Sequence, residues 1–183
     1  MKDKQNKINR SYARALYDAA EAAGVLERLQ RESAMLADIW EEDKNIKKYL
    51  SNPAWDSSHK EKALEIIADK NNLSQPLRGL FKVVAANSRI GNIAGILRDF
   101  IKVYYKRQNI SPVTVYSAIE MSNSQKQRLI QAMEKYTGGR VEVKYKLKPE
   151  LLGGLLIECK TELIDDSVSG KLERIEMLMK GGI

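Results

Sequence analysis

The sequence predicts an α+β fold, in which a bundle of six helices (residues 1–107) is followed by a small domain of strands and helices (residues 108–183). Two observations predict it. Apolar residues recur with helical spacing from Ile8 to about Gln108, whereas strictly alternating, strand-like patterns occur only beyond Ser111-Pro112. Hydrophobic residues make up 43% of the 183 residues, which is enough to bury a sizeable core.

The helices of the first domain are placed by their apolar stripes and by residues that begin or end helices. Gly24 ends the first helix, because glycine tolerates the left-handed conformation found there. Asn52-Pro53 ends the third, since a residue before proline avoids the helical region. Ser58 and Glu61 form a capping box that begins the fourth. The stripes of helices two to six are Leu26, Leu29, Ser33, Leu36 and Trp40; Ile46, Tyr49 and Leu50; Ala63, Leu64, Ile66 and Ile67; Leu77, Leu80, Phe81 and Val84; and Ile93, Ile96, Leu97, Phe100, Ile101 and Tyr104.

The first predicted helix, Ser11 to Gly24, has more apolar surface than one core requires. Its polar residues fall on one narrow stripe, whereas a helix that packs on a single core needs an apolar face of only about 100°. A bulky flank holds Ile8, Tyr12, Leu16 and Ala19, and a smaller flank holds Ala13, Tyr17 and Ala20. One flank therefore has no obvious occupant within the bundle.

The second domain reads as strand, helix, strands and helix. Val113–Tyr116 is rich in strand-forming residues, and a capping box at Ser124 and Gln127 begins a helix that Gly138-Gly139 ends. The run VEVKYKL, residues 141–147, alternates strictly, which is typical of a sheet with one buried and one wet face. Further strands are expected at Leu155–Cys159 and Leu163-Ile164, and a last helix from about Val168 carries Leu172, Ile175 and Met179.

The sequence contains few residues that could form a catalytic, metal-binding or phosphate-binding site. His59 and Cys159 are the only histidine and cysteine, and they fall in different predicted domains, so they make no catalytic pair. Neither a metal-ligand cluster nor a phosphate-binding glycine motif is present, and Asp165-Asp166 fits a turn or helix cap. Gly153-Gly154 fits a β-bulge or a close backbone approach. We expect no enzyme activity, no cofactor and no metal, and, because no apolar run is long enough, no direct membrane insertion.

The charge leaves one alternative open. The net charge of +7 is spread over both halves, and Lys144, Lys146 and Lys148 form a row on the open face of a predicted strand. An RNA-binding or ribosome-associated α+β protein is therefore possible. Glu142 interrupts the row, and Tyr145 points to the other face, so stacking aromatics are expected to be missing there. We therefore favour a protein that does not bind nucleic acid.

Three stretches resemble the delta subunit of bacterial F-type ATP synthase, called the oligomycin-sensitivity-conferring protein in mitochondria. Tyr12–Tyr17 (YARALY) is similar to the family's opening motif, and Ala86–Ile90 (ANSRI) is similar to the end of its fifth helix. Leu151–Glu158 followed by Leu163–Ile175 resembles the family's specific C-terminal signature. Asp166 stands where the family usually has glycine, and Ser169 where it usually has a basic residue.

The resemblance implies a clamp in the peripheral stalk (stator), not an enzyme. In that family the helical domain binds the N-terminal helix of an alpha subunit on the catalytic head. The C-terminal domain holds the C-terminal end of the b subunit, so that rotor torque is resisted during proton-driven ATP synthesis. The implied location is peripheral, on the cytoplasmic face of the bacterial inner membrane.

The resemblance also suggests an occupant for the second flank of the first helix. We expect an amphipathic alpha-subunit helix to lie in a groove between the first and fifth helices. Because the sequence leaves open which flank faces inward, the candidates come from both: Tyr12, Ala13, Leu16, Tyr17, Ala20, Leu80, Val83, Val84 and Asn87. For the b subunit the candidates are Leu172, Ile175 and Met179, which could instead be core.

Overall fold

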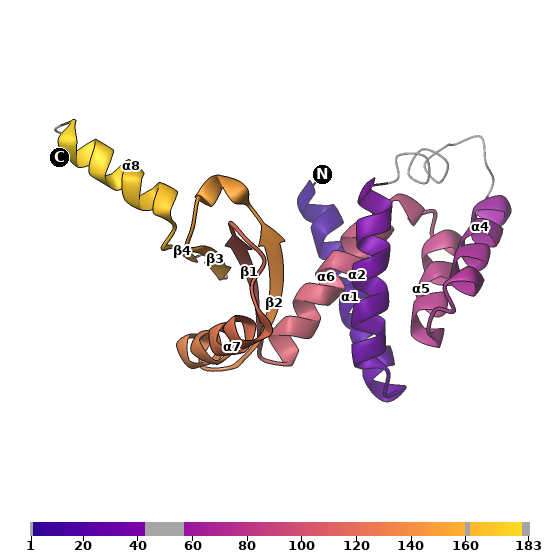
Figure 1. The fold of residues 1–183 in the computed structure, drawn as a ribbon. Helices are drawn as coiled ribbons and strands as arrows, with labels where there is room; N and C mark the ends of the chain where they lie inside the picture. Colours follow the sequence, from indigo (N-terminus) through magenta and orange to yellow (C-terminus); the bar gives the residue numbers. More distant parts are fainter. Residues whose placement is uncertain (1, 43–56, 160–161, 181–183) are drawn as a thin grey trace. The chain divides into compact units, whose positions relative to one another are not determined.

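The structure is a computed structural model that describes residues 2–42, 57–159 and 162–180 (Figure 1). The chain divides into two compact units, Met1–Tyr104 and Tyr105–Ile183. The first unit is helical and the second combines helices with a four-stranded sheet, so the predicted α+β class is confirmed. The predicted third helix, with Ile46, Tyr49 and Leu50, lies outside the described residues, and the number of six helices stays a prediction.

The described part of the first unit is built from α-helices and one 3-10 helix. Tyr17 of the first helix stacks obliquely on Phe100 of the last, with ring centroids 6.5 Å apart, and Trp40 approaches Phe81 at 6.2 Å. The apolar stripes predicted for the second, fifth and sixth helices supply much of this core. The elements are α1 (Lys2–Ala22), α2 (Leu26–Glu42), α4 (Ser57–Lys70), α5 (Gln75–Ala86), the 3-10 helix η1 (Ile90–Asn92) and α6 (Ile93–Arg107), which runs into the second unit.

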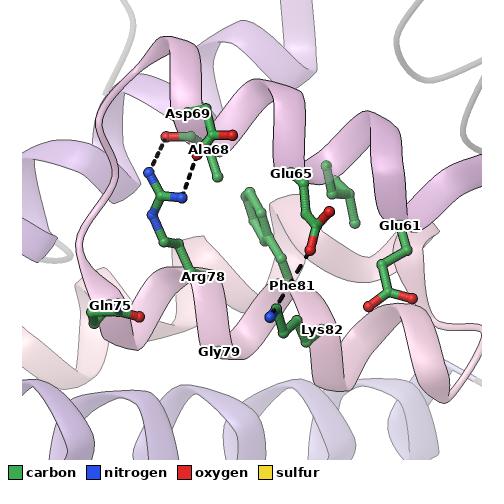
Figure 2. Close-up of a pocket in the computed structure, with 10 residues that line it drawn as sticks. Glu61, Glu65, Ala68, Asp69, Gln75, Arg78, Gly79, Phe81 and Lys82 are labelled. Atoms are coloured by element: carbon green, nitrogen blue, oxygen red, sulfur yellow. Dashed lines mark hydrogen bonds and ion pairs between the residues drawn. The ribbon is translucent and has the colours of Figure 1, made fainter.

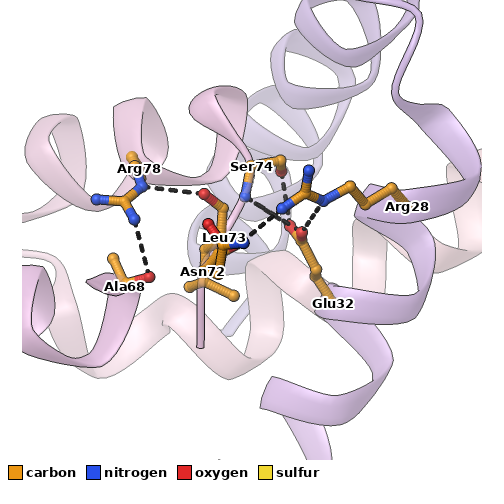
Figure 3. Close-up of polar contacts among 7 residues, drawn as sticks. All are labelled: Arg28, Glu32, Ala68, Asn72, Leu73, Ser74 and Arg78. Carbon is orange, nitrogen blue, oxygen red and sulfur yellow. Dashed lines mark hydrogen bonds and ion pairs between the residues drawn. The ribbon is translucent and has the colours of Figure 1, made fainter. Parts of the chain in front are cut away.

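A polar cluster fixes the start of α5 against α2 (Figure 3). The Glu32 carboxylate on α2 accepts hydrogen bonds from the Ser74 backbone N–H at 3.0 Å and the Ser74 hydroxyl at 2.6 Å. An anion at a helix N-terminus also interacts favourably with the helix dipole. Arg28 pairs with Glu32 at 2.8 Å, and Arg78 donates to the Leu73 carbonyl at 2.9 Å. This cluster holds α5 in position from its first residue.

The second unit contains a mixed sheet with one covered face. Strand order is β2-β1-β3-β4, with β1 and β2 parallel and the other pairs antiparallel. Met133 of α7 packs against Val113, Val115 and Ile157, because α7 is the crossover between the two parallel strands. The elements are β1 (Ile110–Ser117), α7 (Asn123–Thr137), β2 (Arg140–Leu147), the 3-10 helix η2 (Pro149–Leu151), β3 (Leu155–Cys159), β4 (Glu162–Asp165) and α8 (Val168–Met179).

Both predicted capping boxes are wrong in position. The box on α7 joins Ser122 to Gln125, two residues earlier than predicted: the Gln125 N–H donates to the Ser122 hydroxyl, and the Ser122 N–H donates to the Gln125 side chain. Helix α4 already includes Ser57, so Ser58 lies inside its first turn. The predicted end of α7 is confirmed, since Gly138 is left-handed with φ of +69°.

Candidate functional site

An apolar groove of about 350 Å³ runs between α1 and α5. Helix α5 faces the core with residues such as Leu77 and Val84, which are fully buried, yet Val83 is 48% exposed. A large apolar side chain that is half exposed beside a buried stripe marks a second, unoccupied face of this helix. The groove is lined by Tyr12, Ala15, Leu16 and Ala19 of α1 and by Pro76, Gly79, Leu80 and Val83 of α5.

Tyr12 is held at this groove by Arg89, the residue just before η1. The Arg89 guanidinium donates a hydrogen bond to the Tyr12 hydroxyl at 3.0 Å and lies 5.8 Å from the centroid of its ring. A cation close to an aromatic ring interacts favourably with it. The wall that α1 contributes therefore includes an aromatic side chain with a fixed position.

The nine candidates of the first unit fall into three groups. Tyr12, Leu16, Leu80 and Val83 line the groove. Ala13, Tyr17, Ala20 and Val84 are at most 1% exposed and form the core behind it. Asn87 is exposed, and its side-chain amide donates to the Val83 carbonyl at 2.7 Å.

The structure adds Ala15, Ala19, Pro76 and Gly79 to the lining. Ala19 belongs to the bulky flank identified from the sequence, although it was not among the candidates, and Ala15 lines the groove beside it. The bulky flank of α1 faces the groove and the smaller flank faces the core. Pro76 and Gly79 carried no apolar signal in the sequence.

A second hollow of about 400 Å³ lies between α4 and α5 (Figure 2). Acidic side chains from α4 face basic ones from α5. Asp69 pairs with Arg78, and Glu65 approaches Lys82 at 3.9 Å. Gly79 borders this hollow as well as the α1–α5 groove. The ion pairs across the hollow give it walls of mixed charge, in contrast to the apolar groove.

In the second unit, a network of short contacts fixes the start of α8. The Asp165 carboxylate accepts hydrogen bonds from the Ser167 hydroxyl at 2.6 Å and the Ser167 N–H at 2.9 Å. The Ser167 hydroxyl in turn accepts from the Gly170 N–H at 3.0 Å and caps the helix. The hydrogen bonds from Ser167 lower the pKa of the Asp165 carboxyl below its usual value. The predicted turn or cap role of Asp165-Asp166 is thus confirmed.

Glycine is required where the chain passes this network. A Cβ on Gly154, which has φ of +74°, would collide with the Asp166 carbonyl oxygen. The Val168 N–H donates to the Gly153 carbonyl at 3.0 Å. The predicted close backbone approach at Gly153-Gly154 is confirmed, and it joins the loop before β3 to the start of α8.

Beyond its first turn, α8 is exposed on every side, from Lys171 to Lys180 (Figure 1). Leu172 is 53% exposed, Ile175 52% and Met179 84%. These three side chains are therefore not core, which removes the alternative interpretation of their apolar character. Together with Val168, they form a row of apolar side chains along the helix that we call the α8 seam.

The open face of the sheet holds an aromatic ring that the sequence interpretation missed. Tyr116 of β1 lies between two members of the lysine row: its ring centroid is 5.6 Å from the Lys146 Nζ and 5.9 Å from the Lys148 Nζ. The expectation that this face lacks aromatics was wrong, because β1 pairs in parallel with β2 and places Tyr116 beside Lys146. The Tyr116 hydroxyl donates to Glu158 at 3.1 Å, so carboxylates also occupy this face.

The described part of the chain was searched for metal-ligand groups and for membrane-spanning helices. There, no group of three or more histidine, cysteine or acidic side chains is arranged to hold a metal ion. Over the same residues, no helix is long and apolar enough to span a membrane. Cys159 is buried in the sheet of the second unit, whereas His59 is exposed on α4 of the first unit. The two side chains therefore belong to different units.

Comparison with known proteins decides between the two functions left open by the sequence. A family model described as ATP synthase delta (OSCP) subunit matches residues 8–179. The chain belongs to this family. Members of the family are components of the peripheral stalk of ATP synthase, and the comparisons give no support to an RNA-binding protein.

Delta subunits from bacteria match almost the whole chain. ATP synthase subunit delta of Hyphomonas neptunium is 33% identical over 171 residues, which cover 93% of this chain and 94% of the relative. Its counterpart in Rhodospirillum rubrum is 29% identical over 170 residues, covering 93% and 91%. Among solved structures, a chain of the mitochondrial ATP synthase hexamer of Toxoplasma gondii superposes with a TM-score of 0.69. It is 16% identical and covers 93% of this chain and 96% of that chain, which supports the fold.

Proposed function

We propose that this delta-family protein is the non-catalytic clamp that joins the catalytic head of an F-type ATP synthase to its stalk, at the cytoplasmic face of a bacterial membrane. The α1–α5 groove takes the N-terminal helix of an alpha subunit. The α8 seam takes the C-terminal end of the b subunit. Held at both places, the head does not turn with the rotor, and torque drives ATP synthesis.

The observation that carries this proposal is the α1–α5 groove. Its floor and walls are apolar, and Val83 has nearly half of its surface available for contact. An amphipathic helix binds such a groove by inserting apolar side chains that repeat every three to four residues. A catalytic role has no comparable support, because in the α4–α5 hollow Asp69 pairs with Arg78 and Glu65 approaches Lys82.

A single substitution in the groove tests the proposal. Val83→Asp places a carboxylate where the partner's apolar face would cover it without a counter-ion. Burial of an unpaired charge costs on the order of several kcal/mol of binding free energy. We therefore expect the affinity for a synthetic peptide of the alpha N-terminal segment to fall roughly a hundredfold. Calorimetric titration of the full-length protein with this peptide measures the change.

The matched control is Ile66→Asp on α4. Ile66 is 56% exposed, so the two substitutions change a similar side chain at similar exposure, and Ile66 lines neither the groove nor the hollow. Both variants should fold, and Ile66→Asp should bind the peptide like the wild type. Equal affinities of Val83→Asp and wild type would remove this groove from the alpha contact.

A further inference from the structure

The described α-helices contain three glycines, and two of them are explained by contacts within the chain. At Gly95 of α6, an added Cβ would lie 2.6 Å from the Asn9 side-chain nitrogen. At Gly170 of α8, it would collide with the Asp165 carboxylate. In both places a larger residue would displace a packed side chain, so glycine is needed for the fold of the chain itself.

Gly79 of α5 has no such explanation. Apart from its chain neighbours and the backbone of its own helix, no atom of the described chain lies within 4 Å of the position that its Cβ would take, and its φ is not in the left-handed region. Glycine inside a helix is less stable than alanine, because it loses more backbone freedom on folding. The helix therefore carries a destabilising residue that nothing within the described chain requires.

The place of Gly79 suggests what requires it. It borders the α1–α5 groove, whose opposite wall has Ala15 and Ala19 as its small side chains. Without a Cβ, the backbone of α5 is accessible from the groove. Glycine is the usual residue where a backbone must be approached closely, and the distance between packed helices depends on the side chains at the crossing point.

We infer that Gly79 is the crossing point of the bound helix, where the partner's backbone lies directly on that of α5. This inference rests on the proposed function and adds the chemistry of the partner at one position. The partner helix has a small residue, glycine, alanine or serine, facing Gly79, and bulky apolar residues on either side of it that reach toward Leu80 and Val83.

The test separates an effect on folding from an effect on binding, because we expect thermal stability to rise while the affinity for the peptide falls. Gly79→Ala should raise the midpoint of thermal unfolding by about 2–4 °C, since alanine favours the helix and its methyl group meets no side chain or neighbouring element of the described chain. The same methyl group would overpack the interface. We expect the affinity for the alpha N-terminal peptide to fall about tenfold, and to fall further in Gly79→Leu.

Gly91→Ala is the matched control. Gly91 is also exposed, its Cβ position is equally open, and it borders neither the groove nor the α4–α5 hollow. Its variant should bind the peptide with unchanged affinity. A Gly79→Ala variant that is folded and binds within twofold of the wild type, while Val83→Asp has lost affinity, would overturn the inference and leave the proposed groove intact.

Two other outcomes are decided by the same variants. If Gly79→Ala weakens binding and Val83→Asp does not, the helix contacts Gly79 from the α4–α5 hollow, which overturns both the proposed groove and a crossing point flanked by Leu80 and Val83. If the wild-type protein does not bind the peptide at all, both the proposed function of the groove and the crossing point are overturned.

Discussion

Asp165 fixes the start of α8, although it is not part of the helix. It holds Ser167, and Ser167 caps the Gly170 N–H. Because the pKa of Asp165 is lowered in the folded protein, the ionised carboxylate is the form that folding favours. Its contribution is therefore complete well above the usual value of 3.8 and is lost as the pH falls through the lower folded pKa.

We predict that acid loosens the first turn of α8 through this carboxylate. In the wild type, protection of the Gly170 N–H from hydrogen exchange should fall as the pH drops below about 3.8. Asp165→Asn should have low protection already at neutral pH and should lose the pH dependence, because the amide cannot ionise. Asp166→Asn is the control, since Asp166 is exposed and pairs with Lys171. An acid-induced loss of the same size in Asp165→Asn would rule out this role.

The structural roles of some single residues could be predicted from the sequence, and those of others could not. Gly138 and Gly154 could be interpreted because a left-handed turn and a close approach restrict the residue type. The cap of α7 could not, since MSNSQKQ contains two overlapping capping boxes and local sequence does not choose between Ser122 and Ser124. Gly79 gave no signal, because its significance depends on the empty space around it.

Helix α8 has an apolar row that is exposed in the described structure. Val168, Leu172, Ile175 and Met179 are spaced by four, three and four residues, which is the spacing of a coiled-coil seam. Such a seam is buried by a second helix that packs its own apolar side chains between these. The spacing therefore favours a helical end of the b subunit as its occupant.

We predict that replacing Leu172 and Ile175 together with glutamine lowers the affinity for a peptide from the C-terminal end of the b subunit. The expected loss is roughly a hundredfold or more, because each lost burial contributes about 1.5–3 kcal/mol. Stability should hardly change, since both side chains are exposed in the free protein. The control replaces Met177 and Leu178 with glutamine, since these two residues are more exposed than Leu172 and Ile175 and lie off the seam. Surface plasmon resonance compares the two variants, and equal losses would mean that the seam is not a specific contact.

Helical periodicity predicted most elements because it is a local property of the chain. The stripe on α5, with Leu77 and Phe81, is buried as predicted. Pairing between strands is not local, and VEVKYKL gave no sign that β2 runs parallel to β1. For the same reason Tyr116 was not placed beside the lysine row, and Tyr17 could not be assigned to the core before the fold was known.

The molecule as a whole carries one candidate surface on each of its two units. Two linked contacts bind more tightly than either alone, because the second forms at a high effective concentration once the first is made. This arrangement suits a protein that is pulled continually by torque, since one contact can reform while the other holds.

We predict that loss of both surfaces releases the protein where loss of one does not. Val83→Asp alone, or the Leu172 and Ile175 replacements alone, should leave part of the protein on ATP synthase purified from membranes, and the combination should leave almost none. Quantitative blotting of the purified complex measures the retained fraction. A combined variant with Ile66→Asp and the Met177 and Leu178 replacements should be retained like the wild type. Full release by either single change would contradict this prediction, because it would show that the remaining contact alone does not hold the protein.

The exposure of α8 has a consequence for a copy that has not yet been assembled. Such a copy presents leucine, isoleucine and methionine side chains to water along a whole helix, and contact with another unassembled copy would cover them. If the b subunit covers the α8 seam as proposed, synthesis in excess over the b subunit should lead to aggregation or proteolysis. The proposed contact therefore predicts that the cell produces the two proteins in matched amounts.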